Sequence, residues 1–316
     1  MRVHVVATGG TIAMAGELAQ PAHAGDELVA ALPGVDEIAE VSVEQLANVP
    51  GVELSPRLAG EALESAERAV AEGARGAVIL QGTDTIEETA QLGDLLWRHE
   101  EPVVVTGAIR PASAPSADGP GNLLDAIRLA ASPQARRAGA LVCFDGVVHA
   151  GNAAVKSHSW RPGAFFSPAP LGRVREGTVE LRTRPERRPP VGTVRQALDG
   201  GLERRVPIVA AAAGMDGATL QIDGPEAFVL IALGAGHLPK AMLSALDAVL
   251  ERGVPVVACA RTHEGGTLRR TYGFEGSESD LERRGVILAG DASPWKARIR
   301  VITALALRLD PRDFFA

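Results

Sequence analysis

Near its amino terminus the chain reads Val3-His4-Val5-Val6-Ala7-Thr8-Gly9-Gly10-Thr11-Ile12-Ala13. A β-branched apolar run that stops at two glycines predicts a strand that breaks into a turn, because glycine enters positive φ at little cost. Thr11 then follows the carboxyl end of a strand, which is where open α/β sheets bind their ligands. Its hydroxyl is therefore a candidate nucleophile, and Gly10 lets the backbone approach a substrate. A glycine-rich turn with a solvated threonine is the alternative that this segment alone leaves open.

Strands and helices alternate along the rest of the chain, which predicts βαβ crossovers and a mostly parallel sheet with helices on both faces. In the first half the predicted strands are 38–43, 76–80, 102–106 and 140–144, and the predicted helices are 26–32, 55–73, 85–99 and 122–131. Ser55-Pro56 is typical of a helix start, with a capping hydroxyl before a proline. Residues 18–25 are predicted to be a loop, and residues 172–181 a hairpin.

A change of composition divides the chain. Residues 183–205 combine prolines with arginines and show little apolar periodicity, which favours a solvated connector, although the arginines leave anion binding open. A second α/β series follows, with strands at 207–212, 228–233 and 254–258 and helices at 239–252 and 294–309. Because 316 residues exceed one ordinary core, we predict a larger domain at 1–182, a connector at 183–205 and a smaller domain at 206–316.

Composition excludes several classes of function. The net charge of −7 argues against a nucleic-acid partner, which calls for a basic face. No apolar stretch approaches the roughly 20 residues that a bilayer requires, and the amino terminus lacks the features of a signal peptide, so a cytoplasmic protein without membrane contact is expected. Cys143 and Cys259 lie in strand-like runs and predict no disulfide. His149 and His158 lack a supporting ligand set, so we expect no metal and no cofactor.

A second strand ends in a similar turn. Ala77-Val78-Ile79-Leu80 is followed by Gln81-Gly82-Thr83-Asp84-Thr85, which places a second hydroxyl at the same edge of a parallel sheet. Asp84 can alternatively serve only to cap the following helix. A threonine attacks an amide only if a neighbour takes its proton, and Lys156 is a candidate because it is the only lysine before the connector. A surface role for this lysine stays open at this point.

Four motifs stand in order along the chain: Thr8-Gly9-Gly10-Thr11-Ile12-Ala13, Gly82-Thr83-Asp84-Thr85-Ile86-Glu87-Glu88-Thr89-Ala90, Thr106-Gly107-Ala108-Ile109-Arg110-Pro111, and Ala117-Asp118-Gly119-Pro120 with Asn122-Leu123. Together they resemble the bacterial-type L-asparaginase and glutaminase family over nearly the whole chain. The resemblance implies a two-domain α/β fold with a flavodoxin-like smaller domain. It also implies a homo-oligomer, a dimer or tetramer, whose sites lie between the large domain of one subunit and the small domain of its neighbour.

The resemblance also assigns roles to residues. Thr11 matches the family's acyl-forming threonine, and Thr83, Asp84 and Lys156 match its second hydroxyl, carboxylate and lysine set. Ala108 matches the position whose backbone carbonyl orients the scissile amide. The remaining expected substrate contacts lie beside these residues or at the family's recognition positions: Gly10, Gly51, Val52, Gln81, Gly82 and His237. The implied reaction is a double displacement on a small-molecule amide that needs no metal.

The sequence departs from the family pattern around the substrate. Gly51-Val52 stands where the family holds the substrate's charged head group with a Ser-Gln pair, Gln81 replaces a histidine, and His237 replaces an asparagine. The loop after Thr11 lacks the family's flap tyrosine, since the chain's single tyrosine is Tyr272. We therefore predict an asparaginase-like amidohydrolase. The alternatives are an amidase for a related amide or imide without a free amino-acid head group, and a non-catalytic small-molecule sensor.

Overall fold

The structure, a computed structural model, describes residues 1–16, 20–185 and 187–315. The chain forms two compact units, Met1–Leu198 and Asp199–Ala316, and the division falls inside the predicted connector at 183–205. Part of that connector forms the helix α6 (Val194–Gly200), while its residue 186 lies outside the described residues. Residues 18 and 19 of the predicted loop 18–25 also lie outside the described residues.

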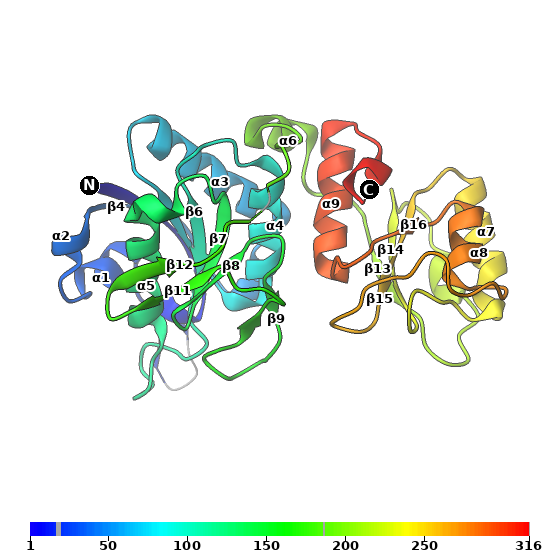
Figure 1. Ribbon diagram of the computed structural model, residues 1–316, viewed down its shortest axis with the longest axis horizontal. Coiled ribbons are helices and arrows are strands. Elements are labelled where there is room, and N and C mark those ends of the chain that lie inside the picture. The colour runs from blue at the N-terminus through cyan, green and yellow to red at the C-terminus, as the bar shows by residue number, and fades with distance from the viewer. Residues whose placement is uncertain (17–19, 186, 316) are drawn as a thin grey trace. The chain divides into compact units, whose positions relative to one another are not determined.

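The first unit is built on an eight-stranded sheet with the order β12-β11-β8-β7-β6-β5-β1-β4 (Figure 1). Its strands are β1 (Arg2–Gly9), β4 (Glu40–Val49), β5 (Ala77–Leu80), β6 (Val103–Thr106), β7 (Ala140–Phe144), β8 (Val147–Ala150), β11 (Gly172–Arg175) and β12 (Thr178–Leu181). The five strands from β4 to β7 run parallel, and β8, β11 and β12 add antiparallel pairs at one edge. The predicted mostly parallel sheet is confirmed.

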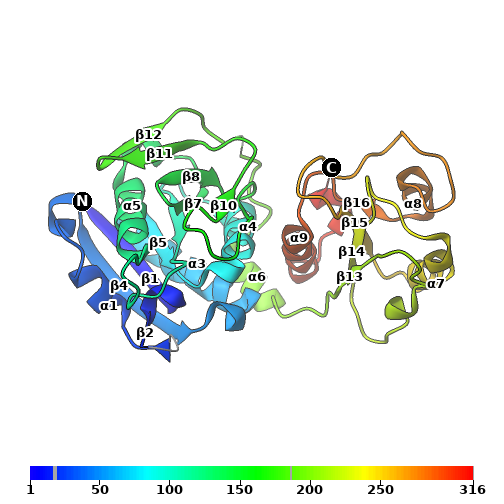
Figure 2. The same cartoon turned by 90° about the horizontal axis from the view of Figure 1, so that it is seen from below.

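Helices cover both faces of this sheet (Figure 2). One face carries α3 (Pro56–Ala71) and α4 (Ile86–Leu96), and the other carries α1 (Gly25–Ala30), α2 (Val35–Ile38) and α5 (Gly119–Ala131). Short strands complete the unit: β2 (Met14–Ala15) pairs with β3 (Gln20–Pro21), and β9 (Val155–Lys156) pairs with β10 (Phe165–Phe166). The central strands β5, β6 and β7 are buried along their whole length, as a sheet covered on both faces requires.

Local chemistry explains the element boundaries. The Oγ of Ser55 accepts a hydrogen bond from the backbone N–H of Leu58, which confirms the predicted helix start. The hairpin at 172–181 is also confirmed, with Glu176 and Gly177 both at positive φ. Several predicted boundaries differ from those in the structure. The predicted strand 38–43 is wrong at both ends, because Ile38 ends the helix α2 and the strand runs from Glu40 to Val49, paired with β1 over nearly its whole length. The predicted loop 18–25 is wrong in part, because Gln20–Pro21 forms β3 by pairing with β2 and Gly25 begins α1.

The second unit contains a four-stranded parallel sheet with the order β13-β14-β15-β16. Its elements are β13 (Ile208–Ala210), β14 (Phe228–Ala232), β15 (Val256–Ala260), β16 (Ile287–Leu288), α7 (Leu243–Glu251), α8 (Glu278–Arg284) and α9 (Pro294–Leu307). Side chains of α7 join the strands in one apolar core, and α9 packs against β14 and β15. The two-domain α/β architecture with a smaller parallel domain is therefore confirmed; the sequence patterns did not predict α8 or β16.

Candidate active site

Three glycines bring three strand ends together. Gly10, Gly51 and Gly82 follow β1, β4 and β5, which are neighbours in the sheet. A Cβ on Gly10, which has φ of +88°, would lie 2.2 Å from the backbone N of Gly82, and a Cβ on Gly82 would lie 2.3 Å from the Cα of Gly51. Only residues without a side chain allow this approach. Thr11 and Thr83 therefore begin at neighbouring points of one sheet edge.

Lys156 lies against the second threonine turn. Its Nζ donates hydrogen bonds to Thr83 Oγ1 at 2.8 Å and to Asp84 Oδ1 at 2.6 Å. Thr83 is buried, and the lysine side chain is 16% exposed, whereas that of Asp84 is 55% exposed. The helix-capping alternative for Asp84 is wrong, because neither the 3-10 turn Thr83–Thr85 nor α4 has a side-chain cap. Strand β9 thus brings a residue 72 positions away to this carboxylate.

Gln81 connects the second threonine turn to the segment after β4. Its buried Nε2 donates to Thr85 Oγ1 at 3.2 Å, and Thr85 Oγ1 donates to the backbone carbonyl of Gly51 at 3.3 Å. Within the described part of the chain, the Oε1 of Gln81 has no hydrogen-bond partner. Val52, next to Gly51, is 71% exposed. The first two residues of the segment 51–53 therefore have no polar side chain, but the backbone of this segment is hydrogen-bonded to the threonine turn at 83–85.

The predicted residue Ala108 lies in the segment that follows β6. It is fully buried, and the segment touches the threonine turn, since a Cβ on Gly107 would lie 2.2 Å from the carbonyl oxygen of Gln81 and 3.4 Å from Thr83 Cγ2. The sites predicted at Thr11, Thr83 and Ala108 thus follow β1, β5 and β6, which are neighbours in the sheet.

His237 belongs to the second unit and has its own polar partner. Its Nε2 lies 3.2 Å from Oε2 of Glu278, a fully buried glutamate, and the rings of Tyr272 and Phe274 meet the imidazole edge to face at 4.8 and 5.1 Å. Burial by itself raises the pKa of Glu278, but hydrogen bonds from the backbone N–H groups of Tyr272 and Thr271 outweigh it and hold that pKa below its ordinary value.

The sequence patterns missed Glu278. Glu275, three residues earlier, is exposed and pairs with Lys240 at 2.6 Å. The available signal was the helix start at Ser277, whose Oγ accepts from Asp280 N and which fixes Glu278 in the first turn of α8. That signal marks the helix, but it does not show that the carboxylate is buried.

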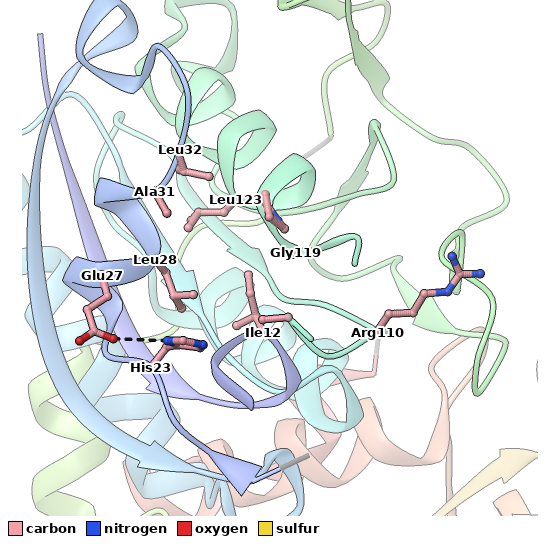
Figure 3. Close-up of a pocket in the computed structure, with 11 residues that line it drawn as sticks. Ile12, His23, Glu27, Leu28, Ala31, Leu32, Arg110, Gly119 and Leu123 are labelled. Atoms are coloured by element: carbon pink, nitrogen blue, oxygen red, sulfur yellow. Dashed lines mark ion pairs between the residues drawn. The ribbon is translucent and has the colours of Figure 1, made fainter. Parts of the chain in front are cut away.

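A small cavity of about 190 Å³ lies behind the Thr11 turn (Figure 3). Ile12, Leu28 and Leu123 line it from three different elements, and the His23–Glu27 ion pair at 3.4 Å borders it. Its lining is mainly apolar, with His23, Glu27 and Arg110 as its polar members, and it includes neither Thr11 nor Thr83. It shows that the residue directly after Thr11 packs against the apolar faces of α1 and α5.

The structure offers few other reactive groups. Burial raises the pKa of the Cys143 and Cys259 thiols, the latter to about 12, so neither is a thiolate near neutral pH. Among residues 1–16, 20–185 and 187–315, no cluster of three or more His, Cys, Asp or Glu side chains is placed to hold a metal ion. No helix within those same ranges has the length and apolar character needed to cross a bilayer.

Comparisons with known proteins show which family the chain resembles. Residues 2–187 match the family model "Asparaginase, N-terminal", and residues 205–314 match "Glutaminase/Asparaginase C-terminal domain". The "Probable L-asparaginase" of Deinococcus radiodurans is 35% identical over 99% of this chain and 95% of its own length, and "L-asparaginase 2" of Escherichia coli is 30% identical over 98% and 90%. The crystal structure of a "Probable Cytoplasmic L-asparaginase" from Campylobacter jejuni matches with a TM-score of 0.85 at 30% identity, over 99% of this chain and 98% of that one. The chain belongs to the asparaginase family of amidohydrolases.

Proposed function

We propose that this protein hydrolyses the side-chain amide of L-asparagine to aspartate and ammonia through an acyl-enzyme on Thr11. The observation that carries the proposal is the contact of Lys156 Nζ with both Thr83 Oγ1 and Asp84 Oδ1. It supplies a buried hydroxyl, a cation and a carboxylate directly beside the turn that presents Thr11. The relatives named as L-asparaginases support the choice of substrate.

The proposed chemistry has two halves. In the first, Thr11 Oγ attacks the amide carbon, the C–N bond breaks, and ammonia leaves with the proton of the threonine hydroxyl. In the second, the oxygen of a water molecule attacks the ester carbon, the bond to Thr11 breaks, and a proton from that water returns to the hydroxyl. Thr83, Asp84 and Lys156 carry protons between these groups, and Thr83 helps to stabilise the oxyanion.

A second candidate substrate class is an amide or imide without a free amino-acid head group. The specific observation in its favour is the pair Gly51 and Val52, whose side chains offer no hydrogen bond and no charge to an α-carboxylate or α-amino group. The threonine chemistry is the same for both classes. They differ only in what holds the part of the substrate away from the amide.

The test is ammonia release measured over L-asparagine, L-glutamine, their D forms, amino-blocked asparagine and dipeptide analogues. We expect turnover by the wild type, none by Thr11→Ala or Thr83→Ala, and full turnover by the control Thr178→Ala in the exposed hairpin. Efficient hydrolysis of L-asparagine selects the first substrate, and a preference for blocked analogues selects the second. Full turnover by both threonine variants would refute the mechanism. An acyl adduct on Thr11 in intact-mass spectra would exclude a non-catalytic sensor.

We further propose a homo-oligomer, a dimer or tetramer, and a cytoplasmic location. The homo-oligomer is supported by Gly51 and Val52, whose side chains offer no polar group to the substrate's head group. A neighbouring subunit would then have to supply the missing polar contacts. The Campylobacter jejuni relative, named a probable cytoplasmic protein, supports the cytoplasmic location. Sedimentation velocity measures the assembly directly, and a monomer with full activity would contradict the shared site.

A further inference from the structure

The motif at 117–123 has no role in the chemistry above, yet it binds the segment that contains Ala108. Asp118 Oδ2 accepts a hydrogen bond from the backbone N–H of Ile109 at 3.0 Å, and Asp118 Oδ1 accepts from that of Arg110 at 2.8 Å. Both carboxylate oxygens are therefore aimed at the backbone just after Ala108. Bonds of this kind, in which the acceptor is charged, are stronger than those between neutral groups.

Asn122, one turn further along α5, completes the arrangement. Its buried Nδ2 donates to Gly107 O at 2.9 Å and to Asp118 Oδ2 at 3.2 Å, and its Oδ1 accepts from the backbone N–H of Asp145 at 2.9 Å. The amide side chain thus uses both of its donor hydrogens and its acceptor oxygen. It fixes the peptide unit that precedes Ala108, as Asp118 fixes the one that follows.

The two motifs are also in steric contact. A Cβ on Gly119 would lie 3.3 Å from Ala108 Cβ and 2.6 Å from Cγ1 of Ile12, the residue after Thr11. Ile12 and Gly119 border the same cavity in Figure 3. The start of α5 therefore packs against both the Thr11 turn and the Ala108 segment.

Asp118 holds the peptide unit that joins Ala108 to Ile109. The N–H of Ile109 and the C=O of Ala108 belong to one planar trans peptide, in which the two groups point in opposite directions. A hydrogen bond that holds the N–H therefore also fixes the direction of the carbonyl. A carboxylate on the N–H also polarises that peptide and makes its carbonyl oxygen a better acceptor. Asp118 therefore influences the Ala108 carbonyl through the shared peptide unit.

We propose that Asp118 is a positioning residue that aims and polarises the Ala108 carbonyl toward the N–H of the scissile amide, with Asn122 as its support. The inference rests on the proposed function, in which that carbonyl accepts from the leaving nitrogen. An ester substrate has no N–H at this place. Loss of Asp118 therefore lowers amide hydrolysis selectively and leaves ester hydrolysis nearly unchanged.

The experiment compares kcat/KM for L-asparagine and for the β-methyl ester of L-aspartate, because both give the same acyl-enzyme and deacylation cancels in the comparison. In Asp118→Asn one of the two backbone N–H groups faces an amide NH₂ instead of an oxygen. We expect the amide-to-ester ratio to fall about 10- to 100-fold, the range for a lost hydrogen bond to a charged group, with ester hydrolysis changed less than about threefold. Asn122→Ala, which spares the carboxylate, lowers the ratio about two- to tenfold.

The matched control is Asp125→Asn on the same helix, a half-buried carboxylate that pairs with Arg128 at 3.1 Å. It should change neither substrate's kcat/KM beyond the effect of stability, which is measured by thermal melting. A ratio that stays within about twofold of the wild type in folded Asp118→Asn, or one that falls equally in Asp125→Asn, overturns the inference alone. If Asp118→Asn does not fold, Asn122→Ala decides on the same ratio. A wild-type chain that hydrolyses neither compound overturns the proposed function and this inference together.

Discussion

Replacement of Lys156 by methionine is expected to lower activity much more than stability. Methionine keeps the length and apolar surface of the lysine stem but removes the Nζ that contacts Thr83 and Asp84 at 2.8 and 2.6 Å. General acid–base groups contribute about 10²- to 10⁴-fold to rate, so we expect kcat to fall by that factor.

The loss of stability is small by comparison. Because the side chain of Asp84 is 55% exposed, its ion pair with Lys156 contributes about 0–1 kcal/mol. The hydrogen bond to Thr83 contributes about 1 kcal/mol more. The free energy of unfolding of the first unit therefore falls by at most about 2 kcal/mol, which corresponds to a decrease in Tm of roughly 4–8 °C. A catalytic loss that merely reflected unfolding would need a much larger decrease.

The assay pairs coupled ammonia release at 25 °C with thermal melting. Lys156→Arg is the second variant, since a guanidinium preserves the charge but does not give up a proton near neutral pH. We expect it to melt near the wild type and still lose most of its turnover. The control is Lys240→Met, which breaks an exposed pair of the same 2.6 Å length with Glu275 and should retain activity. Retention of more than a tenth of wild-type kcat by Lys156→Met would refute the assigned role.

Three further predictions concern packing, pH and recognition. Gly82→Ala places a Cβ 2.3 Å from the Cα of Gly51, so we expect the free energy of unfolding, measured by chemical denaturation, to fall by about 1–3 kcal/mol and turnover to be lost. A variant as stable and active as the wild type would contradict the close approach. Burial raises the pKa of Glu67 to about 7, so the stability that this carboxyl contributes is present below its ordinary pKa near 4.5 and is lost as pH rises through 7. Glu67→Gln should therefore remove roughly 3 kcal/mol of the fall in the free energy of unfolding between pH 5 and 8.5, and Tm profiles identical to those of the wild type would argue against this. Val52→Gln adds a polar group at a 71% exposed position and should lower KM for L-asparagine about two- to tenfold at constant kcat. An unchanged KM favours a substrate amide without a free amino-acid head group.

The sequence predicted the parts of the fold that depend on local signals. The break after β1 follows from Gly9 and Gly10, which have φ of +104° and +88°, and the start of α3 follows from Ser55 before a proline. The neighbouring positions of Thr11 and Thr83 followed from one general rule, that parallel strands end at a common edge. No long-range contact had to be known for these predictions.

Other parts depend on contacts that a linear pattern does not contain. Strands β9 and β10 have two residues each, too few to show a period of two, so the position of Lys156 beside Asp84 was available only from the resemblance. Glu278 has the local appearance of a solvated residue in a first helical turn. It is buried because groups from three other positions, His237, Thr271 and Tyr272, satisfy its two oxygens.

The geometry of the three glycines links residue 51, a predicted recognition position, to the proposed catalytic residue Thr83. A side chain at residue 51 would place its Cβ 3.0 Å from the Cα of Gly82 and 3.1 Å from its carbonyl carbon. Contacts this short require the backbone to shift by a few tenths of an ångström, and the backbone in question leads directly to Thr83. Gly51 therefore allows β4 and β5 to end closer together than a residue with a side chain would. If residue 51 contacts the substrate as proposed, a side chain there also shifts the position of Thr83, whereas exposed Val52 is free of this constraint.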